Sequence, residues 1–261
     1  MLVSEVMLQQ TQASRVVPAY RAFLRRFPTV RALAAASRRD VVASWDGLGY
    51  NRRAVALSEA ARSIVGGHGG RVPSDPVALQ RLPGVGPYTA AAVASIGFGA
   101  RVPAVDTNVR RIVARVFLGV GADEASAEEV HALAKGWLDR NDPGAWNQAL
   151  MDLGREVCRP RPLCEVCPLR PGCRFRVEGW EPRPAKRRQP PFEGSSRQVR
   201  GAVVSRLRRR AEATLAGLAG ETGFPVGRVA SAVAALAWDG LIEAGPAALA
   251  GRPGGRVRLA G

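Results

Sequence analysis

Long hydrophobic runs are absent from this 261-residue chain. Arg, Asp or Pro interrupts every apolar stretch before it reaches the roughly 18 residues that a membrane-spanning helix needs. The first five residues also lack the basic segment and apolar segment that together make a secretory signal. The sequence therefore predicts a cytoplasmic protein without a membrane span.

Acidic residues and lysine are both scarce. Aspartate and glutamate total 22 against 38 lysines and arginines, which leaves a net charge of +16, and only Lys135 and Lys186 are lysine. Residues 181–261 carry half of this excess, +8, in fewer than a third of the residues. Such a charge favours a polyanionic partner, with nucleic acid first and an anionic membrane surface second.

Alternating strand patterns are also lacking over residues 1–157. Gly and Pro there separate segments whose apolar residues recur with the period of a helix, so this part is predicted to be all-α. Ser74 is expected to cap one short helix, and Ser126 with Glu129 forms a capping box that opens another. The main expected helices cover residues 4–26, 30–36, 39–45, 52–65, 126–138 and 145–157.

The C-terminal part is expected to be a separate small module. Residues 181–191 are rich in Pro and Arg without apolar periodicity, which predicts a linker. Residues 192–261 contain two helical stripes followed by two short strand candidates, a pattern typical of a winged-helix-like module. The expected division is a helical domain at 1–157, a cysteine loop at 158–180, the linker, and this module.

Cysteine occurs nowhere except in one 16-residue segment. Cys158, Cys164, Cys167 and Cys173 are spaced C-x5-C-x2-C-x5-C. Disulfides are not expected in a protein that shows no sign of secretion. Four thiolates in a short loop suit either a tetrahedral zinc ion or a four-iron cluster, and the spacing alone does not decide between them.

A second motif lies at residues 82–90, where Gly84, Val85 and Gly86 precede a proline that suits the first turn of a helix. This segment is either a tight turn between helices or a turn whose free amides hold a phosphate oxygen. No Gly-Lys-Ser/Thr follows it, which excludes a nucleotide-binding P-loop.

Two acidic residues have both a structural and a catalytic interpretation. Asp106 stands where a helix is expected to begin, so it is either a simple N-cap or an anion that stabilises positive charge on a sugar. Glu5 lies in the first turn of the first expected helix, where it interacts favourably with the helix dipole. With a raised pKa it would instead serve as a general acid for a leaving purine.

Taken together, these motifs resemble the adenine DNA glycosylases of the helix-hairpin-helix, endonuclease III iron–sulfur superfamily. The resemblance covers about residues 1–176, and residues 4–12 are its most specific part. The landmarks follow in family order at residues 4–12, 47–50, 82–86, 106–109 and 147–154. The implied fold is an all-α helix-hairpin-helix glycosylase with a cluster loop, and the implied cofactor is a [4Fe–4S] cluster on the four cysteines.

The resemblance also implies roles for individual residues. Glu5 would protonate the adenine ring, Asp106 would stabilise the sugar cation, and Asn108 would help to orient the site. Tyr88 stands where strand-cleaving relatives carry a Schiff-base lysine, which implies simple hydrolysis. The implied DNA-contacting residues are Gln9, Gln10, Tyr50, Gly84, Val85 and Gly86.

The predicted function is therefore removal of adenine mispaired with 8-oxoguanine or guanine, by a monomer that binds double-stranded DNA in a bacterial nucleoid. Residues 192–261 are too short for the nudix-like domain of many family members and resemble the short tail of actinobacterial ones. Two alternatives stay open. One is a thymine or uracil glycosylase acting opposite guanine, and the other is a non-catalytic iron–sulfur DNA-binding protein.

Overall fold

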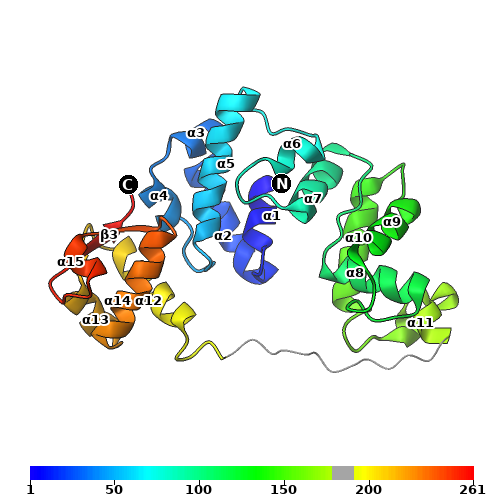
Figure 1. Ribbon diagram of the computed structural model, residues 1–261. Helices are drawn as coiled ribbons and strands as arrows, with labels where there is room; N and C mark the ends of the chain where they lie inside the picture. The colour runs from blue at the N-terminus through cyan, green and yellow to red at the C-terminus, as the bar shows by residue number, and fades with distance from the viewer. Residues whose placement is uncertain (178–190) are drawn as a thin grey trace. The chain divides into compact units, whose positions relative to one another are not determined.

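The computed structural model describes residues 1–177 and 191–261. The expected linker, apart from Pro191, and the last residues of the expected cysteine loop lie outside these ranges. The chain forms two compact units (Figure 1). Unit 1 contains Met1–Glu5 and Val72–Arg187, and unit 2 contains Val6–Arg71 and Arg188–Gly261. This partition differs from the expected domain division, which stays a prediction.

Unit 1 is helical in its described residues, as predicted. Its core surrounds α8, whose Val109, Ile112 and Val113 are fully buried. An edge-to-face aromatic series of Phe117, Trp137 and Trp146 extends this core. Besides the start of α1 (Leu2–Leu8), the elements are α6 (Pro76–Gln80), α7 (Pro87–Phe98), α8 (Thr107–Val113), the π-helical turn η1 (Ala114–Leu118), α9 (Ala127–Trp137), α10 (Pro143–Glu156), the 3-10 turns η2 (Cys164–Val166) and η3 (Arg170–Gly172), and α11 (Arg174–Val177).

Unit 2 combines N-terminal helices with the C-terminal module. Phe23 packs edge-on against Phe27 and Trp45 to form the core of the helical part. Helices α3 and α5 run side by side (Figure 1). The helices of this part are α2 (Ala13–Arg26), α3 (Val30–Ala35), α4 (Arg38–Ala43) and α5 (Arg52–His68).

The C-terminal module has the winged-helix-like architecture that was predicted, with three strands instead of the expected two. Its antiparallel sheet has the order β1-β3-β2, with Ala213 opposite Val257 and Ile242 opposite Leu259. The predicted apolar stripes on α12 and α14 form its core. The elements are α12 (Ser196–Arg208), β1 (Ala213–Thr214), α13 (Leu215–Thr222), α14 (Val226–Trp238), β2 (Ile242–Ala244), α15 (Pro246–Leu249) and β3 (Arg256–Leu259).

Two local predictions are wrong. The expected long first helix is broken between Leu8 and Ala13, and Gln10 has a left-handed backbone with φ 55°. The break follows from Arg53 on α5, whose guanidinium takes the carbonyls that would continue the helix. The cap of α6 is Asp75, whose carboxylate accepts from the Ala78 amide at 2.8 Å, and not the neighbouring serine.

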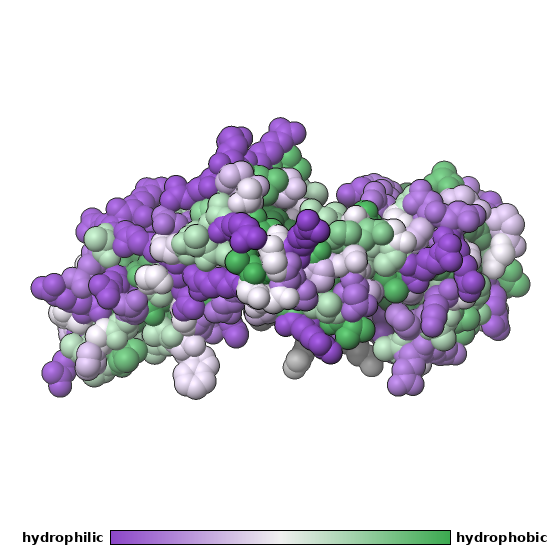
Figure 2. Space-filling view, turned by 90° about the horizontal axis from the view of Figure 1, so that it is seen from above, coloured by the Kyte–Doolittle hydropathy of each residue, from purple (hydrophilic) through white to green (hydrophobic). Residues whose placement is uncertain are grey.

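Two other helix starts agree with the predictions. Ser126 accepts a hydrogen bond from the Glu129 amide at 3.1 Å, as the capping box predicts. Pro87 occupies the first turn of α7. Within the described ranges, no helix combines the length and the apolar character needed to cross a membrane. Hydrophilic side chains cover much of the face in Figure 2.

Candidate active site

Glu5 and Tyr88 meet in unit 1, although 83 residues separate them. The Tyr88 hydroxyl lies 3.3 Å from Oε2 of Glu5 and 3.6 Å from Sδ of Met151. The Glu5 side chain comes from α1 and is buried, with 8% of the residue exposed. Tyr88 comes from the first turn of α7, directly after the residue 82–86 turn.

Burial dominates the electrostatics of this pair. It raises the pKa of the Glu5 carboxyl, the hydrogen bond from Tyr88 and the positive charge of the N-terminal amine oppose this change, and the negative charge of Asp106 adds to it. Burial and the neighbouring Glu5 raise the pKa of Tyr88, so its hydroxyl keeps its proton and acts as a donor. A carboxyl whose pKa is raised by burial stays protonated at higher pH than an exposed glutamate does, which suits it to act as a general acid.

Asp106 is the N-cap of α8 and uses both carboxylate oxygens. Oδ1 accepts from the backbone amides of Asn108 at 2.8 Å and Val109 at 2.7 Å. Oδ2 accepts from the side-chain amide of Asn108 at 2.9 Å. The capping interpretation and the catalytic interpretation are therefore compatible, because the cap fixes the orientation of the charge.

Arg111 continues this network from the next turn of α8. Its Nη2 donates to Oδ1 of Asn108 at 2.8 Å and to the Gly154 carbonyl at 2.7 Å, and its Nε donates to the Cys158 carbonyl at 2.7 Å. Gly154 is required here, because a Cβ at this position would lie 2.6 Å from Cβ of Asn108. Asp106 is thus connected, through Asn108 and Arg111, to the backbone of the first cysteine.

Asn147 supports the same region from inside α10 and is fully buried. Its side-chain amide donates to Ser95 Oγ at 2.7 Å and to the carbonyls of Val102 and Pro143, and its Oδ1 accepts from the Ala104 amide at 2.7 Å. These bonds hold the segment that leads into Asp106. Sequence reasoning identified the Asn147 segment as a landmark but not this structural task.

The residue 82–86 segment is a tight turn between α6 and α7. The Val85 amide donates to the Leu82 carbonyl at 3.1 Å, and Gly84 has φ 75°. Leu82 and Val85 are buried and fix the turn, while Gly84 and Gly86 are exposed. Gly86, which has no side chain, is the N-cap of α7. The turn therefore presents backbone to solvent at the start of a 12-residue helix.

Gln9, Gln10 and Tyr50 lie in unit 2, where one arginine joins the two segments that carry them. Tyr50 is 45% exposed and has φ 45°, a conformation that costs about 1–3 kcal/mol for a residue other than glycine. Arg53 donates to Thr11 Oγ1 at 3.0 Å and to the carbonyls of Leu48 and Gly49 at 3.2 Å, besides its bonds to the end of α1. Its guanidinium also lies 5.6 Å from the Tyr50 ring centroid.

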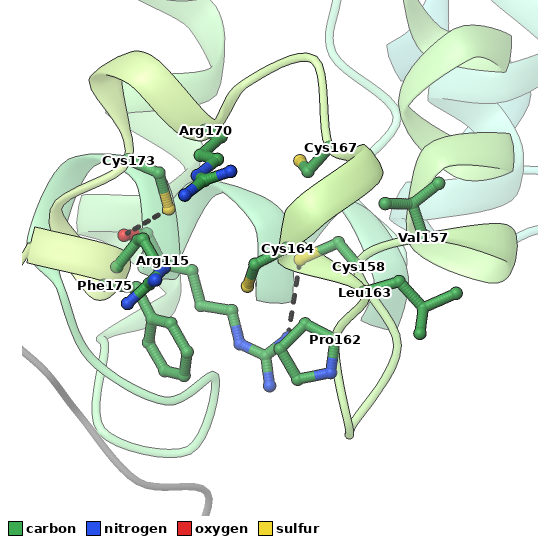
Figure 3. Close-up of a pocket in the computed structure, with 11 residues that line it drawn as sticks. Arg115, Val157, Cys158, Pro162, Leu163, Cys164, Cys167, Arg170, Cys173 and Phe175 are labelled. Carbon is green, nitrogen blue, oxygen red and sulfur yellow. Dashed lines mark hydrogen bonds between the residues drawn. The ribbon is translucent and has the colours of Figure 1, made fainter.

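All four cysteines line one pocket at the end of unit 1 (Figure 3). Buried Arg115, from the π-helical turn, extends through this pocket and donates to Cys158 Sγ at 3.4 Å and to the Arg159 carbonyl at 2.7 Å. Its guanidinium also lies 4.6 Å from the Phe175 ring centroid. Among the described residues, no three His, Cys, Asp or Glu side chains are gathered closely enough to hold a metal ion.

Comparison with known proteins shows the class to which the chain belongs. The family model described as HhH-GPD superfamily base excision DNA repair protein matches residues 3–140. A solved thermostable thymine-DNA glycosylase is 30% identical, with a TM-score of 0.63 over 68% of this chain and 83% of that chain. The family model and the fold thus define a DNA glycosylase of the helix-hairpin-helix class.

The curated relatives show which family within this class the chain resembles. The adenine DNA glycosylase of Mycolicibacterium smegmatis is 43% identical over 208 residues, which is 79% of this chain and 71% of that protein. The adenine DNA glycosylase of Homo sapiens is 46% identical over 179 residues, covering 67% of this chain and 33% of that protein. The chain belongs to the adenine DNA glycosylase family.

Proposed function

We propose that this protein is a monofunctional glycosylase that hydrolyses the N-glycosidic bond of adenine mispaired with 8-oxoguanine or guanine in double-stranded DNA. The observation that carries the proposal is the buried Glu5 carboxyl, held against Tyr88 in the same compact unit as Asp106. Burying a carboxyl costs stability, so its presence at this buried position supports a catalytic task. The protein would act as a monomer at the bacterial nucleoid.

In the proposed reaction, Glu5 gives its proton to a ring nitrogen of the adenine. Protonation lets the base keep the electron pair of the breaking C1′–N9 bond, and the sugar becomes an oxocarbenium-like cation. Asp106 places a negative charge against this cation, and its three hydrogen bonds fix the carboxylate before the substrate arrives. A water molecule then bonds to C1′ and gives a proton to the carboxylate that Glu5 has become, which leaves free adenine and an abasic sugar.

The side chain at position 88 supports hydrolysis without strand cleavage. Strand-cleaving chemistry of this kind needs an amine that forms a Schiff base with the sugar. Tyr88 has none, and the only lysines in the sequence are Lys135 and Lys186. Lys135 lies in the last turn of α9, outside the set of hydrogen-bonded residues around Glu5 and Asp106.

Two groups of residues would contact DNA. The amides at the start of α7, with Gly84, Val85 and Gly86, suit a phosphate oxygen. Gln9, Gln10 and Tyr50 would contact the base pairs around the extruded adenine, a step that costs unstacking energy and needs replacement contacts. The net charge of +16 supplies the attraction to the duplex that does not depend on base sequence.

We also propose that Cys158, Cys164, Cys167 and Cys173 hold a [4Fe–4S] cluster. Four cysteines line one pocket and would supply the thiolate ligands by moving closer together than they lie in the described structure. Arg115 adds a buried positive charge beside them, and its Nε has no partner among the described residues. A buried cation fits a cluster that carries net negative charge with its thiolates. When bound, such a cluster supplies a compact redox-active core that ties the cysteine loop together.

The test measures base release from duplexes containing A opposite 8-oxoguanine, A opposite G, T opposite G and U opposite G, under single-turnover conditions. Adenine release from the first two, with an intact strand until alkali is added, is expected. Release of thymine or uracil alone would favour the other activity, towards which the 30% identity to a thymine-DNA glycosylase points. No release from any duplex would favour a DNA-binding protein. Iron and zinc are measured on the same anaerobic preparation, and stoichiometric zinc without iron would contradict the cluster.

A further inference from the structure

The loop between α4 and α5 presents Tyr50 in a conformation that needs support. Gly47 and Gly49 have φ 75° and 67°, and Tyr50 itself is left-handed. Trp45 Nε1 donates to the Gly49 carbonyl at 3.2 Å from beneath the loop. A tyrosine with this backbone persists only where the surrounding structure holds it there.

Arg208, the last residue of α12 in the C-terminal module, binds both ends of this loop. Its Nη1 forms an ion pair with Asp46, and its Nη2 donates to Oδ1 of Asn51 at 3.0 Å. Its Nε donates to the Val42 carbonyl of α4 at 3.1 Å. Only 11% of the Arg208 side chain is exposed, so its bonds to Val42 and Asn51 are partly buried, whereas its ion pair with Asp46 lies at the surface, where the Asp46 side chain is 70% exposed. One guanidinium therefore bridges the residues that bracket Tyr50.

Further contacts attach the same module to the helices on either side of the loop. Arg38 donates to the Gly240 carbonyl at 3.0 Å, and Arg39 donates to the Arg210 carbonyl at 3.0 Å. Arg52, two residues after Tyr50, pairs at 3.6 Å with the buried carboxylate of Asp239 at the end of α14. The loop and the C-terminal module thus share one hydrogen-bonded interface within unit 2.

We propose that Arg208 is a positioning residue for mismatch recognition: it holds residues 46–51 in the conformation in which Tyr50 contacts DNA. This rests on the proposed function, in which Tyr50 is a contact to the bases around the mismatch. The C-terminal module accordingly contributes to the choice of substrate through the loop that it braces. A purely electrostatic role for the module would instead depend on its total charge and not on this one arginine.

The test compares Arg208→Ala with Arg209→Ala. Arg209 is the next residue, is exposed, and carries the same charge, so both variants lose the same general attraction to phosphate. Amide hydrogen exchange at residues 46–51 is measured without DNA. Affinities for an A:8-oxoguanine duplex and for a fully paired duplex are measured in a Glu5→Gln background, so that the substrate is not consumed.

Arg208→Ala is expected to speed exchange in the loop and to reduce the ratio of mismatch to paired affinity by about tenfold, whereas Arg209→Ala changes neither. In a Tyr50→Ala background, Arg208→Ala is expected to reduce this ratio no further, because the two residues act in series. Equal exchange or equal discrimination in the two arginine variants would overturn the proposal. Additive losses in the double variant would also overturn it.

Asn51→Ala is the second variant, because it removes a single acceptor and keeps Arg208 paired to Asp46. Like Arg208→Ala, it is expected to speed exchange in the loop and to lower the ratio of mismatch to paired affinity. If Arg208→Ala does not fold, Asn51→Ala decides, and an unchanged exchange rate together with an unchanged ratio would contradict the proposal. A wild-type protein that neither discriminates mismatches nor releases adenine would refute the proposed function. The exchange comparison would still show whether Arg208 braces the loop.

Discussion

Replacing Glu5 with glutamine keeps the size of the side chain and removes its proton. In the structure this carboxyl is buried and its pKa is raised, so a protonated population persists at pH values where an exposed glutamate is ionised. General acid catalysis is typically worth about 10²–10⁴-fold. At about 1.36 kcal/mol per factor of ten, the expected loss is about 2.7–5.4 kcal/mol of transition-state stabilisation.

The assay is single-turnover adenine release as a function of pH. The wild-type rate is expected to fall as pH rises through the pKa of Glu5, because the protonated acid is lost, and this limb should be absent in Glu5→Gln. Glu128→Gln, which removes an exposed carboxylate from the first turn of α9, is the matched control and should keep the wild-type profile. Rates for Glu5→Gln within about threefold of wild type at every pH would mean that Glu5 is not the acid.

The same variant has an opposite effect on stability. A carboxyl whose pKa is raised by folding stabilises the protein fully below its unfolded pKa, and this contribution is lost as pH rises through the folded value. Glu5→Gln should therefore melt at a higher temperature than wild type at pH 8, and the gain should disappear near pH 4. If Glu5→Gln releases adenine more slowly and is more stable than wild type at pH 8, Glu5 has a catalytic role and not a structural one.

Three further outcomes are expected. Asp106→Asn should slow adenine release by about 10²–10³-fold while duplex affinity survives. The double variant Asp106→Asn, Asn108→Asp restores complementary hydrogen bonding between the two side chains and should remain slow. Wild-type rates in either variant would exclude the electrostatic role of Asp106. Gly154→Ala should cost about 1–3 kcal/mol in unfolding free energy and slow release, because its Cβ would lie 2.6 Å from that of Asn108, whereas Gly136→Ala, with open space around it, should do neither. Affinity for any duplex should fall steeply between 50 and 200 mM salt, and a flat salt dependence would exclude phosphate contacts as the main source of binding.

Features set by local sequence were predictable. Pro87 in the first turn of α7, the Ser126 cap and the buried stripes of α12 and α14 depend on neighbours within a few residues. The same rules predicted one continuous helix over residues 4–26, since nothing local marks Gln10 for a left-handed backbone. That break depends on Arg53, which lies more than forty residues further along the chain.

The sequence predicted the arrangement of the site only in part. The resemblance pointed to Glu5, Tyr88 and Asp106, whereas periodicity and composition could not show that Tyr88 donates to Glu5. Long-range arginine contacts were missed entirely. Arg111 and Arg208 look like ordinary members of an arginine-rich sequence, because their partners at Cys158 and Asn51 are near them only in the folded chain.

The two acidic residues of the site differ in what would happen to them if catalysis were no longer selected. Asp106 closes the first turn of α8 with three hydrogen bonds, so a descendant that had become a mere DNA-binding protein would still gain from keeping it. Glu5 is buried at a cost to folding and has no comparable structural benefit, so drift should remove it early. Among relatives of this chain, a glutamate at position 5 is therefore a better marker of a working glycosylase than an aspartate at position 106.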